Sequence, residues 1–104
     1  MKVAESIFEY TKPLPKSEDY GLTSQIRRSA LSVSANITEA FGRNSTKEKI
    51  HFYYISRGSA FETMSHLEYA TRVGYISRKI SKEIEANLSK IIQELNRLIS
   101  AFRR

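Results

Sequence analysis

The chain has 104 residues and no cysteine, and its 17 lysines and arginines against 11 aspartates and glutamates give a formal net charge of +6. Its length fits a single domain over residues 1–104. The lack of cysteine excludes disulfides and thiolate metal sites. An apolar content of 40% argues against a disordered basic tail. No signal peptide and no apolar run of roughly 18 residues is found, so we expect a cytoplasmic protein without a membrane partner.

A short first helix is predicted over Met1–Thr11, where Val3 and Ile7 begin an apolar pattern of helical spacing. Pro13 and Pro15 end this helix, because proline lacks a backbone donor and disfavours helical geometry in the residue before it.

The second predicted helix begins after Ser17, which we expect to be its N-cap. One face is apolar and should be buried: Leu22, Ile26, Ala30, Val33, Ile37 and Phe41. Small residues thin the same helix and should let a neighbouring backbone approach closely: Ser29, Ala30, Ser32, Ser34 and Ala35. We prefer this packing role to a catalytic serine, since the helix supplies no histidine base. Gly42 is expected to end the helix in a left-handed conformation.

A capping box of Ser45 and Glu48 predicts a third helix over Thr46–Val73. It carries a broad apolar stripe, made by Ile50, Tyr53, Tyr54, Phe61, Met64 and Leu67, and a second stripe made by Phe52, Ile55, Ala70 and Val73. Two apolar faces need two neighbours, so the second face packs on another helix of this chain or on another copy. A close helix contact is expected at Gly58, because a glycine inside a helix costs about 1 kcal/mol relative to alanine.

The fourth predicted helix follows Gly74 and a Ser77 N-cap and runs to Phe102. Its apolar residues have the most regular helical spacing in the chain: Ile84, Leu88, Ile91, Ile92, Leu95, Leu98, Ile99 and Phe102. Four helices with short loops predict an all-α fold, an antiparallel up-and-down four-helix bundle with a short first helix.

The sequence contains no pattern that supports catalysis. A di-iron bundle needs two Glu-x-x-His pairs, and Glu48 with His51 forms only one, because Thr63 precedes His66 at that spacing. Glu62 and His66 are better explained as a local ion pair or an interface contact than as an acid and base couple. There is no phosphate-binding loop and no nucleophile with its base. We therefore expect no enzyme activity, no catalytic residues, no metal, no cofactor and no small-molecule substrate.

The basic residues remain as candidates for binding RNA or DNA, since an excess of cations attracts polyanions. The candidate nucleic-acid-binding residues come from the second and third helices: Arg27, Arg28, Arg43, Lys47, Lys49 and Arg57. Tyr53 and Tyr54 either stack on bases or pack in the core. The alternative is a solvated face on which Arg27 or Arg28 pairs with an acidic residue, Glu39 or Glu68.

The run GLTSQIRRSALSVSANITEAFGR, continued by STKEKIHFYYISRGSAFETMSHLEYA, resembles bacterial four-helix bundle proteins related to the protein encoded in intervening sequences of large-subunit ribosomal RNA. The resemblance spans about residues 20–77 and is most specific in the second helix, at Gln25, Arg27, Arg28, Ser32, Ala35, Asn36, Ile37 and Glu39. It implies an up-and-down bundle and no enzyme. Relatives include the accessory protein of diversity-generating retroelements, a basic homopentamer that binds nucleic acid, so the resemblance implies a homo-oligomer, with five copies as the expected number.

Two functions are compatible with these observations. The first is a non-enzymatic oligomeric basic bundle that binds structured nucleic acid, with ribosomal RNA as a candidate. The alternative is a protein-protein interaction or scaffold module with no direct nucleic-acid role, in which the charge only confers solubility.

Overall fold

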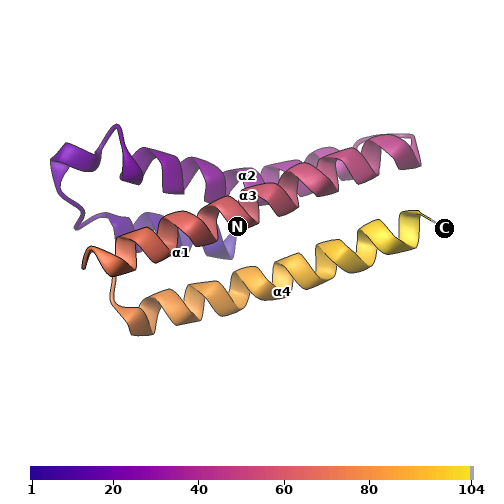
Figure 1. The fold of residues 1–104 in the computed structure, drawn as a ribbon. Coiled ribbons are helices and arrows are strands. Elements are labelled where there is room, and N and C mark those ends of the chain that lie inside the picture. The colour runs from indigo at the N-terminus through magenta and orange to yellow at the C-terminus, as the bar shows by residue number, and fades with distance from the viewer. Residues whose placement is uncertain (104) are drawn as a thin grey trace.

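The computed structural model describes residues 1–103 and consists of four α-helices and one 3-10 turn. The elements are α1 (Lys2–Thr11), η1 (Lys16–Glu18), α2 (Leu22–Phe41), α3 (Thr46–Arg72) and α4 (Arg78–Phe102). Three long helices run back and forth, and α1 lies beside one half of their length (Figure 1). The predicted all-α bundle with a short first helix is confirmed. Within the described chain, no helix is long and apolar enough to cross a membrane.

The main core lies where all four helices meet. In this half α1 packs on α2 and α4, while α3 packs on the opposite sides of the same two helices. Ile7, Ile26 and Leu88 are fully buried there, and Leu67 is 1% exposed. Because these residues come from all four helices, the core fixes α1 against the rest of the bundle.

The other half of the bundle contains only three helices. Ser34 Oγ contacts Met1 Sδ at 3.6 Å, so α1 begins beside Ser34. Phe41 lies seven residues further along α2, about two turns beyond the start of α1, and it is 71% exposed. The prediction that Phe41 belongs to the core was wrong, because the helix that covers this face of α2 extends only as far as Ser34.

A second apolar cluster fills the three-helix half. Tyr53, from α3, is 1% exposed and stacks on Phe102 with ring centroids 6.0 Å apart. Ala40, Leu95 and Ile99 are buried around it. Of the two fates considered for Tyr53, the structure therefore shows core packing.

The contact between α2 and α3 is close because small residues face each other. Ser56 Oγ is fully buried and donates a hydrogen bond to the Val33 carbonyl oxygen at 2.7 Å. A side chain that reaches the backbone of the next helix requires a short separation between the helix axes. This is the packing role predicted for the small residues of α2.

The start of α2 differs from the prediction. Ser17 lies inside η1 and does not cap the helix, whose N-cap position is Gly21. The backbone N–H of Leu22 instead donates to the Glu18 carboxylate at 3.3 Å. The 3-10 turn delays the start of α2 by one turn, which puts Glu18 rather than Ser17 within reach of the free N–H groups.

The other helix ends follow the sequence more closely. Ser45 accepts from the Glu48 N–H at 3.1 Å, and Ser77 accepts from the Ile80 N–H at 3.2 Å, as N-caps should. Gly42, however, has φ −82° and is right-handed, so its predicted left-handed geometry was wrong. Gly74 is the glycine that adopts positive φ, at 86°.

The outward face of α3 is unexpectedly apolar. Phe61 is 54% exposed and Tyr69 is 53% exposed, although Phe61 was predicted to be a core residue. Helical spacing also allows Phe61 to point outward beside Gly58, where an added Cβ would meet no atom within 4 Å. The close helix contact predicted at Gly58 is therefore absent from this chain's own packing.

Candidate nucleic-acid interface

One end of the bundle gathers cations and aromatic rings. It comprises the α2–α3 turn, the first three turns of α3 and the end of α4, and we call it the basic end; its residues are Arg43, Lys47, Lys49, Phe52, Tyr54, Arg57 and Arg103. Figure 1 shows that the α2–α3 connection and the C-terminal end of α4 lie at the same extremity of the molecule. It is also the three-helix half of the bundle.

Tyr54 is held between two arginines. The guanidinium carbon of Arg57 lies 4.8 Å from the centroid of the Tyr54 ring, and that of Arg103 lies 5.7 Å away. Arg57 Nη1 also donates to Asn96 Oδ1 at 2.7 Å, which ties α3 to α4. Neither arginine forms an ion pair within residues 1–103, so both keep their charge available to an anion.

Arg43 occupies the α2–α3 turn. Its guanidinium lies 4.7 Å from the centroid of Phe52, and its nitrogens are 3.0 Å from Glu39 and 3.8 Å from Glu48. The two carboxylates partly neutralise this arginine. Its position over the ring is therefore fixed, but it offers less free charge than Arg57.

The two lysines of the basic end have different roles. Lys49 is partly buried and its Nζ donates to the Ala40 carbonyl oxygen at 3.1 Å, which also accepts from the Arg43 N–H at the end of α2. Lys47 is exposed and forms no ion pair with any described residue. Lys47 is thus the freer cation of the two.

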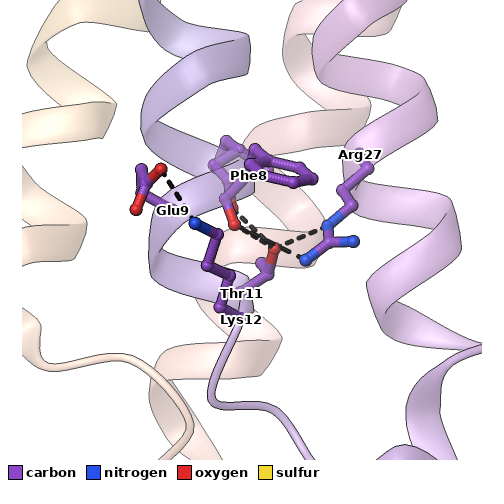
Figure 2. A network of polar contacts seen from close by, with 6 residues as sticks. Phe8, Glu9, Thr11, Lys12 and Arg27 are labelled. Atoms are coloured by element: carbon purple, nitrogen blue, oxygen red, sulfur yellow. Dashed lines mark hydrogen bonds and ion pairs between the residues drawn. The ribbon is translucent and has the colours of Figure 1, made fainter.

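Arg27 lies elsewhere and is used for packing. Its Nε donates to Thr11 Oγ1 at 2.8 Å, its Nη2 reaches the Phe8 carbonyl oxygen at 3.5 Å, and its guanidinium lies 4.6 Å from the Phe8 ring centroid. Figure 2 shows this arginine reaching across from α2 to the C-terminal end of α1. A cation at this end of a helix is favourable, because the free carbonyls there are negative. Arg27 therefore fastens the short helix to the bundle.

Arg28 lies far from the α2–α3 turn. It precedes Arg43 by 15 residues, which is about 22 Å along α2. It is exposed and has no ion-pair partner in the described part of the chain. The alternative pairing of Arg27 or Arg28 with acidic residues is not what the structure shows, because Glu39 pairs with Arg43 and Glu68 is engaged by two other arginines.

Glu68 connects the end of α3 to the start of α4. Its carboxylate accepts from Arg78 Nη1 at 2.8 Å and from Arg72 Nε at 2.7 Å. These two charged donors lower the pKa of Glu68 to about 2. Glu68 therefore neutralises part of the positive charge of Arg72 and Arg78, at the end of the bundle opposite to the basic end.

The described residues include no group of three or more histidines, aspartates and glutamates that could hold a metal ion. His51 is exposed beside Phe52. His66 Nε2 lies 4.0 Å from Glu62 Oε2, in the local contact that the spacing predicts.

Comparison with known proteins decides the family. A family model described as 23S rRNA-intervening sequence protein matches residues 1–97. The chain belongs to this family. The match confirms the relationship predicted from the second and third helices and extends it to α1 and most of α4.

A solved structure is similar to this chain over nearly its whole length. It is the crystal structure of a protein with unknown function from the S23 ribosomal protein family of Bacteroides thetaiotaomicron. The two chains are 28% identical and superpose with a TM-score of 0.84, covering 94% of this chain and 92% of the other. A search of curated proteins found no match. Neither name describes a chemical reaction.

Sequence reasoning missed two features of this interface. Arg103 was not among the candidate residues, yet its guanidinium lies over the Tyr54 ring of another helix. Phe52 packs at the edge of the second apolar cluster, as its apolar stripe predicts, and its ring also lies under the Arg43 guanidinium, which the sequence did not indicate. Arg103 and Tyr54 are 49 residues apart, and Arg43 and Phe52 lie on opposite sides of a turn, so no helical spacing marks either pair.

Proposed function

We propose that this protein is a non-enzymatic, cytoplasmic homo-oligomer that binds structured RNA, with ribosomal RNA as the first candidate, through its basic end. The observation that carries the proposal is the stack of Arg57 and Arg103 on Tyr54 beside the exposed Lys47. The family description adds the link to ribosomal RNA. The net charge of +6 supplies a long-range attraction for the same polyanion.

The proposed contacts combine two kinds of interaction. Lysine and arginine neutralise phosphates and release counterions, which gives affinity that falls steeply with salt. Arginines fixed over aromatic rings add flat surfaces on which unpaired bases can stack. Arg57 and Arg103 are already ordered by Tyr54, so binding costs less side-chain entropy than it would for free arginines.

The test is RNA affinity measured by fluorescence anisotropy as a function of salt concentration. Neutralising two cations of the basic end, with Lys47→Gln and Arg57→Gln together, should reduce the slope of log affinity against log salt by about 1.4 to 1.8. The matched control is Lys79→Gln with Lys82→Gln, two exposed lysines at the opposite end of the bundle. Equal slopes for the two double variants would refute the assignment to the basic end.

The oligomeric part of the proposal rests on the outward face of α3. Phe61, Tyr69, Val73 and Ile55 leave apolar surface exposed there, and Gly58 leaves room for another helix to approach. Light scattering should report a multimer, five copies being what the family resemblance implies. Phe61→Ser should shift the protein toward monomers, whereas Leu31→Ser, at an equally exposed leucine of α2, should not. A wild-type monomer at high micromolar concentration would refute self-association.

The same apolar face favours a second candidate function, a protein-protein interaction module with no direct role for nucleic acid. In that case a protein partner would stay bound at high salt, because burial of apolar surface is not screened. Crosslinking in cells followed by recovery of protein without RNA would favour this second function over the first.

A further inference from the structure

A polar groove lies on the surface between α2 and α3, and its α3 wall begins at Ser59, two residues from Arg57 of the basic end. Its volume is about 430 Å³, within the usual range of about 300 to 1,000 Å³ for small-molecule sites. The groove is lined by six residues, of which α2 contributes four and α3 two: Gln25, Arg28, Ser29, Ser32, Ser59 and Glu62.

The two walls of the groove carry side chains of opposite charge that form no ion pair with each other. Arg28 projects from α2 and Glu62 from α3, and within residues 1–103 Glu62 contacts only His66, at 4.0 Å, while Arg28 contacts no carboxylate. A cation and an anion on facing walls without a mutual ion pair leave a gap that a ligand with both donors and acceptors can bridge. A simple anion would satisfy Arg28 and be repelled by Glu62.

The floor of the groove contains one hydroxyl hydrogen that is not used in a hydrogen bond within the described residues. Ser59 and Ser32 hydroxyls share a hydrogen bond at 2.9 Å, and Ser32 Oγ also accepts from Asn36 Nδ2 at 2.9 Å. Two hydroxyls bring two hydrogens, and only one is consumed between them. The other finds no acceptor in the described part of the chain, so it can be donated to a ligand. By contrast, Ser29 deeper in the floor both donates to the Ile26 carbonyl oxygen and accepts from Thr63.

Guanine is the nucleobase whose edges match this arrangement. Its O6 and N7 atoms accept together from an arginine, which is the commonest specific contact of that base. Its N1–H and N2–H₂ groups are donors that a carboxylate accepts, whereas adenine and uracil each present an acceptor at one of these positions. We propose that the groove binds an unpaired guanine of the RNA, held between Arg28 and Glu62 with the Ser32–Ser59 pair beneath it.

This inference rests on the proposed RNA binding and adds base recognition to it. Single-stranded loops and bulges are the parts of RNA whose base edges are free to enter such a groove. The basic end then supplies most of the affinity, and the groove, which adjoins it along α3, selects the base.

The first test is an NMR titration of the full chain with the four nucleoside monophosphates and with ribose 5-phosphate. Guanosine monophosphate should shift the amide signals of Arg28, Ser32 and Ser59 saturably, and at least fivefold more tightly than the other probes. Equal shifts from all probes, including ribose 5-phosphate, would mean a phosphate site and would overturn the proposal. An absence of shifts at these residues at millimolar guanosine monophosphate would overturn it as well.

The second test separates this inference from the proposed function. Glu62→Gln keeps the shape of an exposed side chain but removes the carboxylate, so preference for a guanine-containing oligonucleotide over its inosine or adenine counterpart should fall at least fivefold. Lys47→Gln with Arg57→Gln should lower the affinity for all three equally. Salt-dependent RNA binding by the wild type without guanine preference would overturn the groove and leave the basic end intact. If no RNA binds, the proposed function fails, and the titration alone decides the groove.

Discussion

Thr11→Val is a direct probe of how α1 is held. Thr11 is 2% exposed; its hydroxyl donates to the Ile7 carbonyl oxygen at 2.6 Å and accepts from Arg27 Nε at 2.8 Å. Valine has the same branched shape but provides no oxygen. A hydrogen bond to a charged group contributes about 1.5 to 3 kcal/mol. Arg27 is partly exposed and can recruit water in the variant, so we expect a loss near the lower limit, about 1.5 kcal/mol.

Arg27→Ala should cost more than Thr11→Val. It removes the same hydrogen bond and also the contact with the Phe8 ring at 4.6 Å, which contributes about 0.5 to 1 kcal/mol at an exposed site. The single loss should therefore be about 2 to 2.5 kcal/mol. Because both variants delete one shared bond, the double variant should also lose only about 2 to 2.5 kcal/mol, which corresponds to a coupling energy of about 1.5 kcal/mol.

Urea unfolding followed by far-ultraviolet circular dichroism measures all three variants. With a typical slope of about 1 to 3 kcal/mol per molar urea, a loss of 1.5 kcal/mol moves the midpoint by about 0.5 to 1.5 M. Additive losses, with a coupling below about 0.5 kcal/mol, would refute the conclusion that Arg27 fastens α1 through Thr11. As a control, Thr11→Val should leave the salt dependence of RNA binding unchanged, since it removes no charge.

Three further changes test other parts of the fold. Gly74→Ala should lower the free energy of unfolding by about 1 to 2 kcal/mol in urea, because alanine is strained at φ 86°. Gly58→Ala should instead raise it by about 0.5 to 1 kcal/mol in the isolated chain, because the added Cβ meets no atom and alanine favours the helix. Ser77→Ala should lower the thermal midpoint through loss of about 1 kcal/mol of capping; an unchanged midpoint would contradict the N-cap assignment. Folding lowers the pKa of Glu68 from 4.5 to about 2, so its stabilising contribution is complete above pH 4.5 and disappears as the pH falls toward 2. Thermal midpoints measured across that window should therefore fall less for Glu68→Gln than for the wild type, and parallel curves would contradict the assignment.

The helices could be predicted from the sequence because their causes are local. Apolar spacing, the N-caps Ser45 and Ser77 and the Pro13 break all act within a few residues, and the structure has each of them near its predicted place. The N-cap of α2 was mistaken because the chain inserts a 3-10 turn first, and Ser17 is a good N-cap residue in either arrangement.

Which face of a helix is covered could not be predicted in the same way. Phe41 continues the apolar stripe of α2 without interruption, and its exposure depends on where α1 starts, which is a matter of register between two helices. The role of Arg27 has the same origin, because the hydroxyl and carbonyl groups that engage it lie 16 and 19 residues earlier in the chain, respectively. Helical spacing identifies the residues of a face, whereas the number of its neighbours is a property of the assembled bundle.

The short α1 also gives the bundle two halves of unequal resistance to opening. Near α1, helix α2 is packed against both α1 and α3. Beyond Ser34, α2 is covered mainly by α3 and by the second apolar cluster around Tyr53. Local opening in proteins begins where apolar packing is sparse. The last two turns of α2 should therefore exchange their amide hydrogens faster than its second and third turns, where the N–H groups are also bonded within the helix. A ligand on the basic end would bind the half that opens first, and by mass action its binding would slow exchange there most.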